Sequence, residues 1–464
     1  GSLTGVSGFQ VSIAADKAFT PGDKCDVLVA MNPAALKTQY KFCKPTSSII
    51  IDVDSFKKAD LEKAQFEATD AAGAIAEMGI KQDVIEVPVT SMVKDVLADS
   101  GMDPKAMLKC RNMLALGLVC YIFNRDLSIA EKFLREKFAK KPAIAENNIK
   151  VIHAGYDFGA NTHASVSHTY NVVSKQTPAK KGRYMDINGN KATAYGLIAA
   201  AEKAGLRLYL GSYPITPATD VLHELSKHKS LGVTTVQCED EIAGCASALG
   251  ASFAGALGVT STSGPGICLK SEAMNLAVIM ELPLVVIDVQ RGGPATGLPT
   301  KSEQTDLLQC LFGRNGETPM PVIAATSPAD CFESAYAACK IALEHMTPVV
   351  FMSDAYIANG SEAFKLPNLA EYPAINPPYV PESMKGTWTP YMRDERDVRY
   401  WAVPGREGFA HILGGLEKDS KTGAISTNPE NHDLMCRLRQ SKIDKIQVPD
   451  VEVEGDKDDA DLLI

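Results

Sequence analysis

The sequence predicts an α/β protein with two consecutive parallel-sheet domains followed by a long connector. Short apolar runs recur along roughly the first three quarters of the chain, as in buried parallel strands. Helical patterns separate these runs, and strand-helix alternation favours a doubly wound sheet. Beyond residue 366 the composition shifts to Pro, Gly and charge, with YPAINPPYVPE at 372–382. That composition is typical of a connecting segment.

The first domain is expected over residues 1–180. Its strands are predicted at DVLVAM (26–31), SSIIIDV (47–53) and DVIEVPV (83–89). Periodic apolar positions predict helices over 103–123 and 129–139. The polar, basic stretch SKQTPAKKGRYMDINGN at 174–190 breaks the pattern, so we interpret it as a linker.

The second domain is expected over residues 181–370 and begins with the helix TAYGLIAAAEKAG at 193–205. Its strands are predicted at 207–212, 233–237, 284–289 and 347–352, with long helices over 265–281 and 327–345. The connector is expected over 371–450. Residues 451–464 close on DADLLI and predict the truncated start of a further α/β domain, whereas the N-terminal part of the first domain is expected to be missing.

The composition excludes several classes of protein. With 45% hydrophobic and 22% charged residues, the chain has the profile of an ordinary α/β enzyme. A net charge of −9, without clusters of Lys and Arg, argues against nucleic acid as partner. No apolar run approaches the length of a membrane span. The eleven cysteines include no C-x-x-C, which indicates reduced thiols and a cytoplasmic protein without its own iron–sulfur cluster.

Two successive strand ends carry unusual residues. The strand at 207–212 runs into YPITP, where Pro214 and Pro217 fix the backbone and make a stiff polar loop. The strand at 233–237 is followed by CEDE at 238–241, which opens a long helical run. Because ligands of open α/β sheets bind beyond the carboxyl ends of the strands, we expect a binding crevice here.

Glu241, at the start of that helix, has two interpretations. An acidic residue in a first helical turn commonly interacts with the helix dipole and the free N–H groups. Alternatively, a carboxylate beside an aminopyrimidine hydrogen-bonds its ring nitrogen and thereby promotes removal of a thiazolium proton. The helix itself, EIAGCASALGASFAGA, is rich in small residues, which suits either a central buried helix or a subunit interface.

Two further strand ends are candidates for anion binding. Arg291 follows the strand at 284–289 and lies in the Gly- and Pro-rich loop QRGGPATGLPTKSEQTDL. Its guanidinium suits a substrate carboxylate, although an ion pair with a nearby acid is an equal alternative. STSGPG at 261–266 offers hydroxyl and N–H groups to an anion.

Several absences narrow the chemistry. The sequence contains no G-x-x-x-x-G-K-[ST] phosphate loop and no G-x-G-x-x-G opening a helix, which disfavours a nicotinamide dehydrogenase. The eight histidines form no H-E-x-x-H pattern, so no metal ligand is expected in this chain.

In YPITPATD (213–220), EDEIAG (239–244) and the loop at 290–307, the sequence resembles the α subunits of 2-oxoacid:ferredoxin oxidoreductases, in particular the 2-oxoglutarate branch called KorA. The resemblance implies a γ-type domain fused ahead of a pyrimidine-binding domain of a thiamine diphosphate enzyme. It also implies oxidative decarboxylation of a 2-oxoacid with coenzyme A, giving acyl-CoA (succinyl-CoA from 2-oxoglutarate), carbon dioxide and reduced ferredoxin.

The resemblance also implies roles for particular residues. Glu241 contacts the aminopyrimidine, Thr216 faces substrate and cofactor, and Arg291 binds the substrate carboxylate. Tyr213, Pro214, Ile215 and Pro217 complete the cofactor-binding loop. No G-D-G motif for the diphosphate and its metal occurs in this chain.

The resemblance therefore implies a β subunit that carries Mg²⁺ and a [4Fe–4S] cluster, a ferredoxin as electron acceptor and an (αβ)₂ assembly. Alternatives are the same chemistry on pyruvate or a branched-chain 2-oxoacid, or a non-catalytic scaffold subunit.

Overall fold

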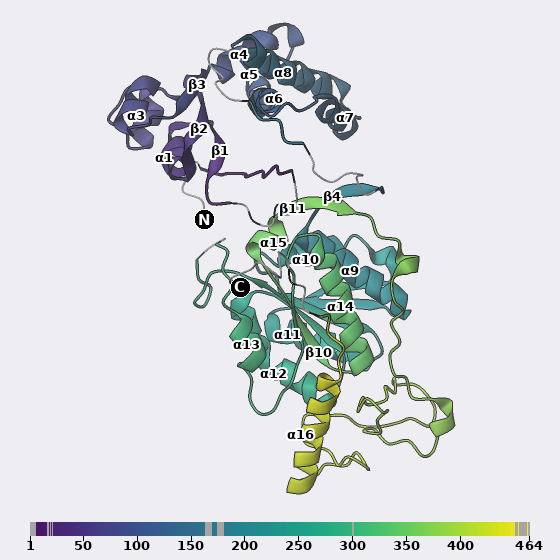
Figure 1. Ribbon diagram of the computed structural model, residues 1–464. Helices are drawn as coiled ribbons and strands as arrows, with labels where there is room; N and C mark the ends of the chain where they lie inside the picture. The colour runs from purple at the N-terminus through teal and green to yellow at the C-terminus, as the bar shows by residue number, and fades with distance from the viewer. Residues whose placement is uncertain are drawn as a thin grey trace. The chain divides into compact units, whose positions relative to one another are not determined.

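A computed structural model of the chain describes residues 6–15, 18, 20, 22–162, 169–173, 181–298, 301–450, 453 and 462. The chain divides into two compact units, Gly1–Lys180 and Lys181–Ile464 (Figure 1). Each contains a parallel sheet, so the predicted α/β fold with two consecutive parallel sheets is confirmed. The expected start of a further domain at 451–464 lies almost entirely outside the described residues.

The first unit is built on a three-stranded parallel sheet in the order β1-β2-β3. The strands are β1 (Cys25–Ala30), β2 (Cys43–Asp52) and β3 (Asp83–Val87). In β2, Ile49 and Ile51 pack into one apolar cluster and Ile50 into another. Both faces of the sheet are therefore covered, which explains the continuous apolar run in the sequence.

Two different groups of helices cover the two faces of this sheet. The apolar cluster that contains Ile49 and Ile51 also contains residues of three helices, α1 (Pro33–Gln39), α2 (Lys58–Lys63) and α3 (Ala71–Glu77). The other cluster includes residues of α4 (Val89–Val96), α5 (Pro104–Met107), α6 (Arg111–Ile122) and α8 (Pro142–Asn161). The helix α7 (Ser128–Lys137) packs against α8.

Two details of these helices differ from the prediction. The single helix expected over 103–123 is divided, because a 3₁₀ turn at Leu108–Cys110 separates α5 from α6. The sequence analysis also missed α8, which packs closely on α6. A methyl group at Gly117 would lie 2.0 Å from the carbonyl oxygen of Ile152, so the two backbones meet where only glycine fits.

The second unit contains six parallel strands in the order β6-β5-β7-β8-β10-β9. They are β5 (Leu208–Ser212), β6 (Val233–Gln237), β7 (Leu257–Thr262), β8 (Leu284–Gln290), β9 (Val322–Ala324) and β10 (Pro348–Asp354). All strands predicted for this domain from the sequence are present, and one large apolar core surrounds them.

Helices lie on both faces of this six-stranded sheet (Figure 1). One face carries α9 (Gly189–Ala204), α10 (Thr219–Leu225) and α14 (Asp330–His345), and the other carries α11 (Glu241–Phe253) and α12 (Gly264–Met280). The short helices α13 (Leu307–Phe312) and α15 (Ala355–Asn359) follow β8 and β10. The sheet thus has the doubly wound arrangement expected from the sequence.

The linker interpretation of 174–190 is wrong for its second half. Tyr184–Asn188 forms β4, which pairs antiparallel with β11 (Ser361–Lys365), and α9 begins at Gly189. The strand is short, mostly unburied and polar, so the sequence shows little apolar alternation. Residues 174–180 lie outside the described part of the chain.

The connector after β11 is more ordered than its composition indicates. It contains 3₁₀ turns at Leu369–Glu371 and Glu382–Met384, and it ends in α16 (Pro429–Asp444), which the sequence analysis missed. Trp401 and Arg399 are fully buried. The connector thus contributes core side chains and charges to the second unit.

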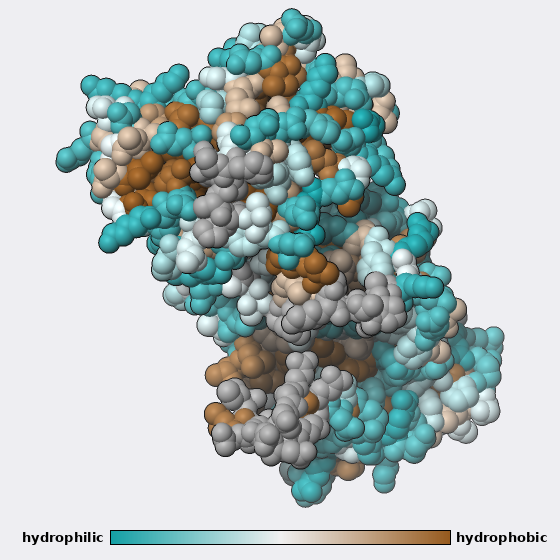
Figure 2. Space-filling model, turned by 45° about the horizontal axis from the view of Figure 1, so that its top comes forward, coloured by the Kyte–Doolittle hydropathy of each residue, from teal (hydrophilic) through white to brown (hydrophobic). Residues whose placement is uncertain are grey.

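The surface combines hydrophilic areas with separate hydrophobic patches, as the face in Figure 2 shows. Within the described part of the chain, no helix is both long and apolar enough to cross a membrane. All eleven cysteines are free thiols, and six of them are buried.

Candidate functional site

The strand order places a candidate crevice at the carboxyl edge of the second sheet. After β5 the chain adds β6 on one side and β7 on the other, so the direction of winding changes at β5. Ligands of doubly wound sheets bind at such a switch point. The loops after β5, β6, β7 and β8 carry YPITP, CEDE, the STSGPG segment and Arg291, as expected from the sequence.

The YPITP loop is anchored at both ends. Ser212 at the end of β5 donates its hydroxyl to the carbonyl oxygen of Ser261 on β7, at 2.9 Å. Pro217 is buried, and its carbonyl oxygen accepts a hydrogen bond from Asn190 at 2.9 Å. Ile215 packs against the core.

The other loop residues face outward to different degrees. Tyr213 and Thr216 are exposed, whereas Pro214 is half-buried. The loop therefore presents Tyr213 and Thr216 from a fixed backbone.

Thr216 and Arg291 are brought together by this arrangement. The Arg291 guanidinium donates from Nη1 to the carbonyl oxygen of Thr216 at 2.7 Å and from Nη2 to that of Thr296 at 3.1 Å. Its Nε is buried and has no hydrogen-bond partner among the described residues. No acidic side chain in this part of the chain forms an ion pair with Arg291, so the ion-pair alternative is not observed for the described residues.

The loop that carries Arg291 is held over the sheet edge by side-chain amides and carboxylates. Gln290 accepts a hydrogen bond from the backbone N–H of Asp306 at 3.0 Å, and Gln304 donates to Asp354 at 2.7 Å. Glu303 accepts from the backbone N–H of Gly293 at 2.7 Å. The guanidinium is thus presented from a braced loop.

Glu241 is the first residue of α11, but it does not cap this helix. Asp240 is the N-cap, and its carboxylate accepts the backbone N–H of Ala243 at 2.7 Å. Glu241 is only 8% exposed. Among the described residues, no hydrogen bond or ion pair engages its carboxylate. Its carboxylate oxygens are not among the fully buried polar atoms that lack a partner, so the side chain is largely covered while its carboxylate stays accessible. An accessible carboxylate without a protein partner is compatible with the ligand-binding interpretation of Glu241.

The surroundings of Glu241 fix its position. Lys270 on α12 is fully buried and donates its amine to the backbone oxygen of Glu241 at 2.9 Å and to the hydroxyl of Thr260 at 3.0 Å. Burial lowers the pKa of Lys270 below its usual value, against the attraction of Cys245 and Glu241. A methyl group at Gly266 would lie 2.9 Å from Cγ of Glu241, so a glycine there leaves room for this side chain.

Asp288 and Asp306 form a buried carboxyl pair that the sequence analysis missed. Asp288 lies on β8 and is fully buried. Burial first, and then the neighbouring Asp306, raise the pKa of Asp288 well above its usual value. Burial also raises the pKa of Asp306. The raised pKa favours the protonated form of Asp288. The signal in the sequence is an aspartate within the apolar strand LVVIDV.

Comparisons with known proteins identify the chain's relatives. The family described as pyruvate flavodoxin/ferredoxin oxidoreductase, thiamine diP-binding, matches residues 199–437, and pyruvate ferredoxin/flavodoxin oxidoreductase matches residues 3–158. The 2-oxoglutarate oxidoreductase subunit KorA of Mycobacterium tuberculosis is 49% identical over all of this chain and 70% of its own length. This chain belongs to the 2-oxoacid:ferredoxin oxidoreductase family.

Other proteins of this oxidoreductase family are also similar to the chain. The 2-oxoglutarate synthase subunit KorA of Methanothermobacter marburgensis is 34% identical over 60% of this chain and 72% of its own length. A solved 2-oxoglutarate:ferredoxin oxidoreductase from Magnetococcus marinus, with 2-oxoglutarate, coenzyme A and succinyl-CoA bound, has a TM-score of 0.80 and 30% identity. That match covers 95% of this chain and 72% of the other. The family predicted from the sequence is confirmed.

The family match places the predicted site residues in one segment of this oxidoreductase. Thr216, Glu241 and Arg291 all lie within the residues matched by the thiamine diphosphate-binding family. The helix α11 buries Gly244, Ala248 and Ser252 but exposes Ile242. Its small residues therefore pack within the unit on one face, and a subunit interface on the other face stays a prediction.

Proposed function

We propose that this chain is the catalytic α subunit of a 2-oxoglutarate:ferredoxin oxidoreductase. The reaction is oxidative decarboxylation of 2-oxoglutarate with coenzyme A to succinyl-CoA and carbon dioxide, with electrons passed to ferredoxin. The names of its KorA relatives and of the Magnetococcus marinus structure support the substrate. The observation that carries the catalytic assignment is Glu241, a largely buried residue whose accessible carboxylate lacks a partner among the described residues.

The residues at the sheet edge fit the pyrimidine half of thiamine diphosphate. An accessible carboxylate without a protein partner suits a ring nitrogen, and the glycine at 266 leaves space beside the Glu241 side chain. When bound, thiamine diphosphate supplies the nucleophilic carbon for attack on the 2-oxoacid carbonyl. Glu241 holds the proton on the ring nitrogen of the aminopyrimidine.

The YPITP loop and Arg291 have complementary roles in this proposal. Tyr213, Pro214, Ile215 and Pro217 shape the wall against which the cofactor packs, and Thr216 offers its hydroxyl to substrate and cofactor. Arg291 already positions Thr216 through its backbone oxygen. The unused donors of the guanidinium bind the substrate carboxylate.

The proposal assigns the remaining parts of the complex to a partner. Residues 1–180 are the γ-type domain, 181–370 the pyrimidine-binding domain and 371–450 the connector. Because the chain has no G-D-G motif, Mg²⁺, the diphosphate contacts and a [4Fe–4S] cluster belong to a β subunit in an (αβ)₂ assembly. Free thiols at all eleven cysteines fit a cytoplasmic enzyme.

One surface of the second unit supports a partner next to the site. The helix α13 follows directly after the Arg291 loop and exposes a group of large apolar side chains. These are Leu307, Leu308, Leu311 and Phe312. Contiguous exposed apolar side chains are typical of interaction surfaces.

The proposal is tested by an activity assay on the purified complex. Reduction of a viologen dye is measured with 2-oxoglutarate and coenzyme A. Glu241→Gln is expected to lower kcat by about 10²- to 10⁴-fold, because it removes the group that holds the proton. The matched control is Glu239→Gln, an exposed acid two residues earlier, which leaves the rate unchanged.

Two outcomes would count against the proposal. A wild-type rate in Glu241→Gln would show that this carboxylate is not catalytic. Efficient turnover of pyruvate or a branched-chain 2-oxoacid, with none of 2-oxoglutarate, would overturn the substrate and leave the catalytic site in place.

A further inference from the structure

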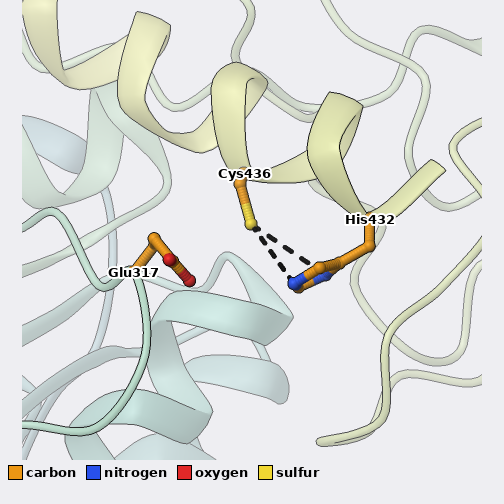
Figure 3. Close-up of side chains that lie close together, drawn as sticks. All are labelled: Glu317, His432 and Cys436. Atoms are coloured by element: carbon orange, nitrogen blue, oxygen red, sulfur yellow. Dashed lines mark hydrogen bonds between the residues drawn. The ribbon is translucent and has the colours of Figure 1, made fainter. Parts of the chain in front are cut away.

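Three potential metal ligands meet in the second unit, away from the carboxyl edge of the sheet. His432 and Cys436 lie one helical turn apart on α16, and Glu317 lies in the segment between α13 and β9 (Figure 3). Their ligand atoms all lie within 4.8 Å of one another. The thiol sulfur of Cys436 is 3.8 Å from Nε2 and 3.9 Å from Nδ1 of His432. We call these three residues the α16 cluster.

A second carboxylate orients the histidine of the α16 cluster. Oε2 of Glu417 lies 2.8 Å from Nδ1 of His432. Glu417 is itself held by both terminal nitrogens of Arg439, at 3.3 and 3.2 Å. With its Nδ1 proton donated to Glu417, His432 has Nε2 free to bind a cation. Metal-binding histidines commonly have their other ring nitrogen fixed by a carboxylate in this way.

Cys436 is poised to act as a sulfur ligand. The guanidinium of Arg439 donates to its sulfur at 3.3 Å. This contact helps to hold the sulfur close to the ligand atoms of His432 and Glu317.

Both segments that carry the ligands are held in place. Arg314 donates to the carbonyl oxygen of Thr318 at 3.1 Å and to its hydroxyl at 3.3 Å, closing the loop around Glu317. Asn275 on α12 donates to the backbone oxygen of Asn315 at 3.1 Å. A metal site requires ligands on such supported segments, because small displacements weaken coordination.

The helix that carries the other two ligands is also fixed. Asn428 caps α16 by accepting the backbone N–H of Asn431 at 2.7 Å. Asn431 in turn donates its side-chain amide to the backbone oxygen of Lys418 at 2.8 Å. These bonds tie the first turn of α16, including His432, to the connector.

A cavity of about 360 Å³ adjoins the α16 cluster. Glu317, His432, Glu417 and Arg439 contribute to its lining, so two cluster residues and both of their supporting charges face it. The remaining wall includes Leu276, Val278 and Ile279 on α12 and the acidic Glu272. A cation bound by the cluster would thus have a coordination position directed toward a space large enough for water or a small ligand.

We propose that Glu317, His432 and Cys436 bind a divalent transition metal ion of the Zn²⁺ class, with an open coordination position at the cavity. Sulfur, imidazole and carboxylate ligands together suit Zn²⁺. They disfavour Mg²⁺ and Ca²⁺, which prefer sites made of oxygen ligands. Three protein ligands and one exchangeable position match the arrangement of open zinc sites. The ion connects the end of the connector to the loop before β9, independently of the thiamine site.

The test is metal binding to the purified complex after treatment with a chelator and desalting. One equivalent of Co²⁺ per chain is expected to give the absorption bands of a tetrahedral ion with a thiolate charge-transfer band. Cys436→Ser removes the charge-transfer band. Glu417→Gln keeps the band but weakens binding by about 10- to 100-fold, as expected for loss of an outer carboxylate. Zn²⁺ displaces Co²⁺ and raises the Tm of the wild type.

Matched controls separate this site from unspecific binding. Cys268→Ser removes an exposed thiol outside the cluster, and it leaves the Co²⁺ spectrum unchanged. His432→Gln gives a second loss-of-site variant, and circular dichroism checks the fold of each variant. A Co²⁺ spectrum in Cys436→Ser identical to that of the wild type, or an ion lost equally in Cys268→Ser, means an adventitious ion only and overturns the proposal. These readouts do not depend on turnover of any 2-oxoacid.

Discussion

Two buried glutamates of the second unit have opposite surroundings. Glu281, directly after α12, is fully buried and forms an ion pair with both terminal nitrogens of Arg393. It also accepts the amine of Lys442 at 2.7 Å. Glu241, at the start of α11, is 8% exposed, and its carboxylate has no partner among the described residues. The carboxylate thus has charged partners at Glu281, whereas at Glu241 it has none among the described residues.

The difference marks Glu281 as a structural carboxylate and leaves Glu241 with the unpaired carboxylate that our proposal requires. Burial alone would raise the pKa of Glu281, but Arg393 and Lys442 hold that pKa far below its usual range. Glu281 therefore ties the connector and α16 to the end of α12. The carboxylate of Glu241 has no such partners among the described residues, so it contributes no comparable tie within the unit.

The largest effect on stability is expected for Glu281→Gln. The substitution leaves Arg393 and Lys442 as buried charges without their counter-charge, and breaking a buried pair in this way costs about 3–5 kcal/mol. Chemical unfolding of the purified chain measures the loss. The matched control is Glu241→Gln, which is expected to leave the free energy of unfolding unchanged or to raise it slightly. Equal losses in the two variants would remove the distinction between the two glutamates.

The pH dependence of the same variant has a definite sign. Because the pKa of Glu281 is lowered in the folded state, its stabilising contribution is present above the unfolded pKa of about 4.3. That contribution is lost as the pH falls through the folded value. Glu281→Gln is therefore expected to flatten the acid side of the stability profile.

A smaller effect is expected for Asp240→Ala. Loss of the side chain that caps α11 costs about 0.5–2 kcal/mol, whereas Glu239→Ala, which removes a neighbouring exposed acid, costs nothing measurable. Thermal unfolding of both variants checks this. If Glu241→Ala destabilised the protein as much as Asp240→Ala and kept full activity, Glu241 would be a helix-terminus residue and nothing more.

A pH-dependent effect on stability is expected at the Asp288–Asp306 pair. Asp288 has a raised pKa, so the folded protein binds more protons than the unfolded chain above the unfolded pKa. The raised pKa of Asp288 therefore makes the free energy of unfolding fall as the pH rises. Asp288→Asn keeps a donor but does not titrate, so its stability relative to the wild type is expected to grow as the pH rises above the unfolded pKa of about 3.9. Tm measured against pH checks this, with the exposed Asp220→Asn as control. Parallel curves for Asp288→Asn and the wild type would refute the raised pKa of Asp288.

Much of the fold was predictable because its signals are local. The apolar strands of both sheets and the chemistry at YPITP and CEDE are contiguous in the sequence. The capping role of Asp240 is a local signal as well, but Glu241 beside it fits the same pattern. Only the structure distinguishes the two, through the bond from Ala243 to Asp240.

The parts that the sequence did not predict depend on distant residues. The contact between Arg291 and Thr216 joins the ends of two different strands. The polar helix α16 is held by the ion pair between Lys442 and Glu281, which lie far apart in the chain. His432 and Cys436 are visible as a helical pair in the sequence, but Glu317 joins them only in the folded unit. Pairings of this kind leave no periodic signal.

The most direct test of the role of Glu241 is hydrogen–deuterium exchange at C2 of thiamine diphosphate bound to the complex, followed by acid quench and NMR. The wild type is expected to exchange this proton about 10²- to 10⁴-fold faster than Glu241→Gln, with the cofactor bound to both. Glu239→Gln should exchange as fast as the wild type. An unchanged exchange rate in Glu241→Gln would contradict the assignment of Glu241 as the activating group.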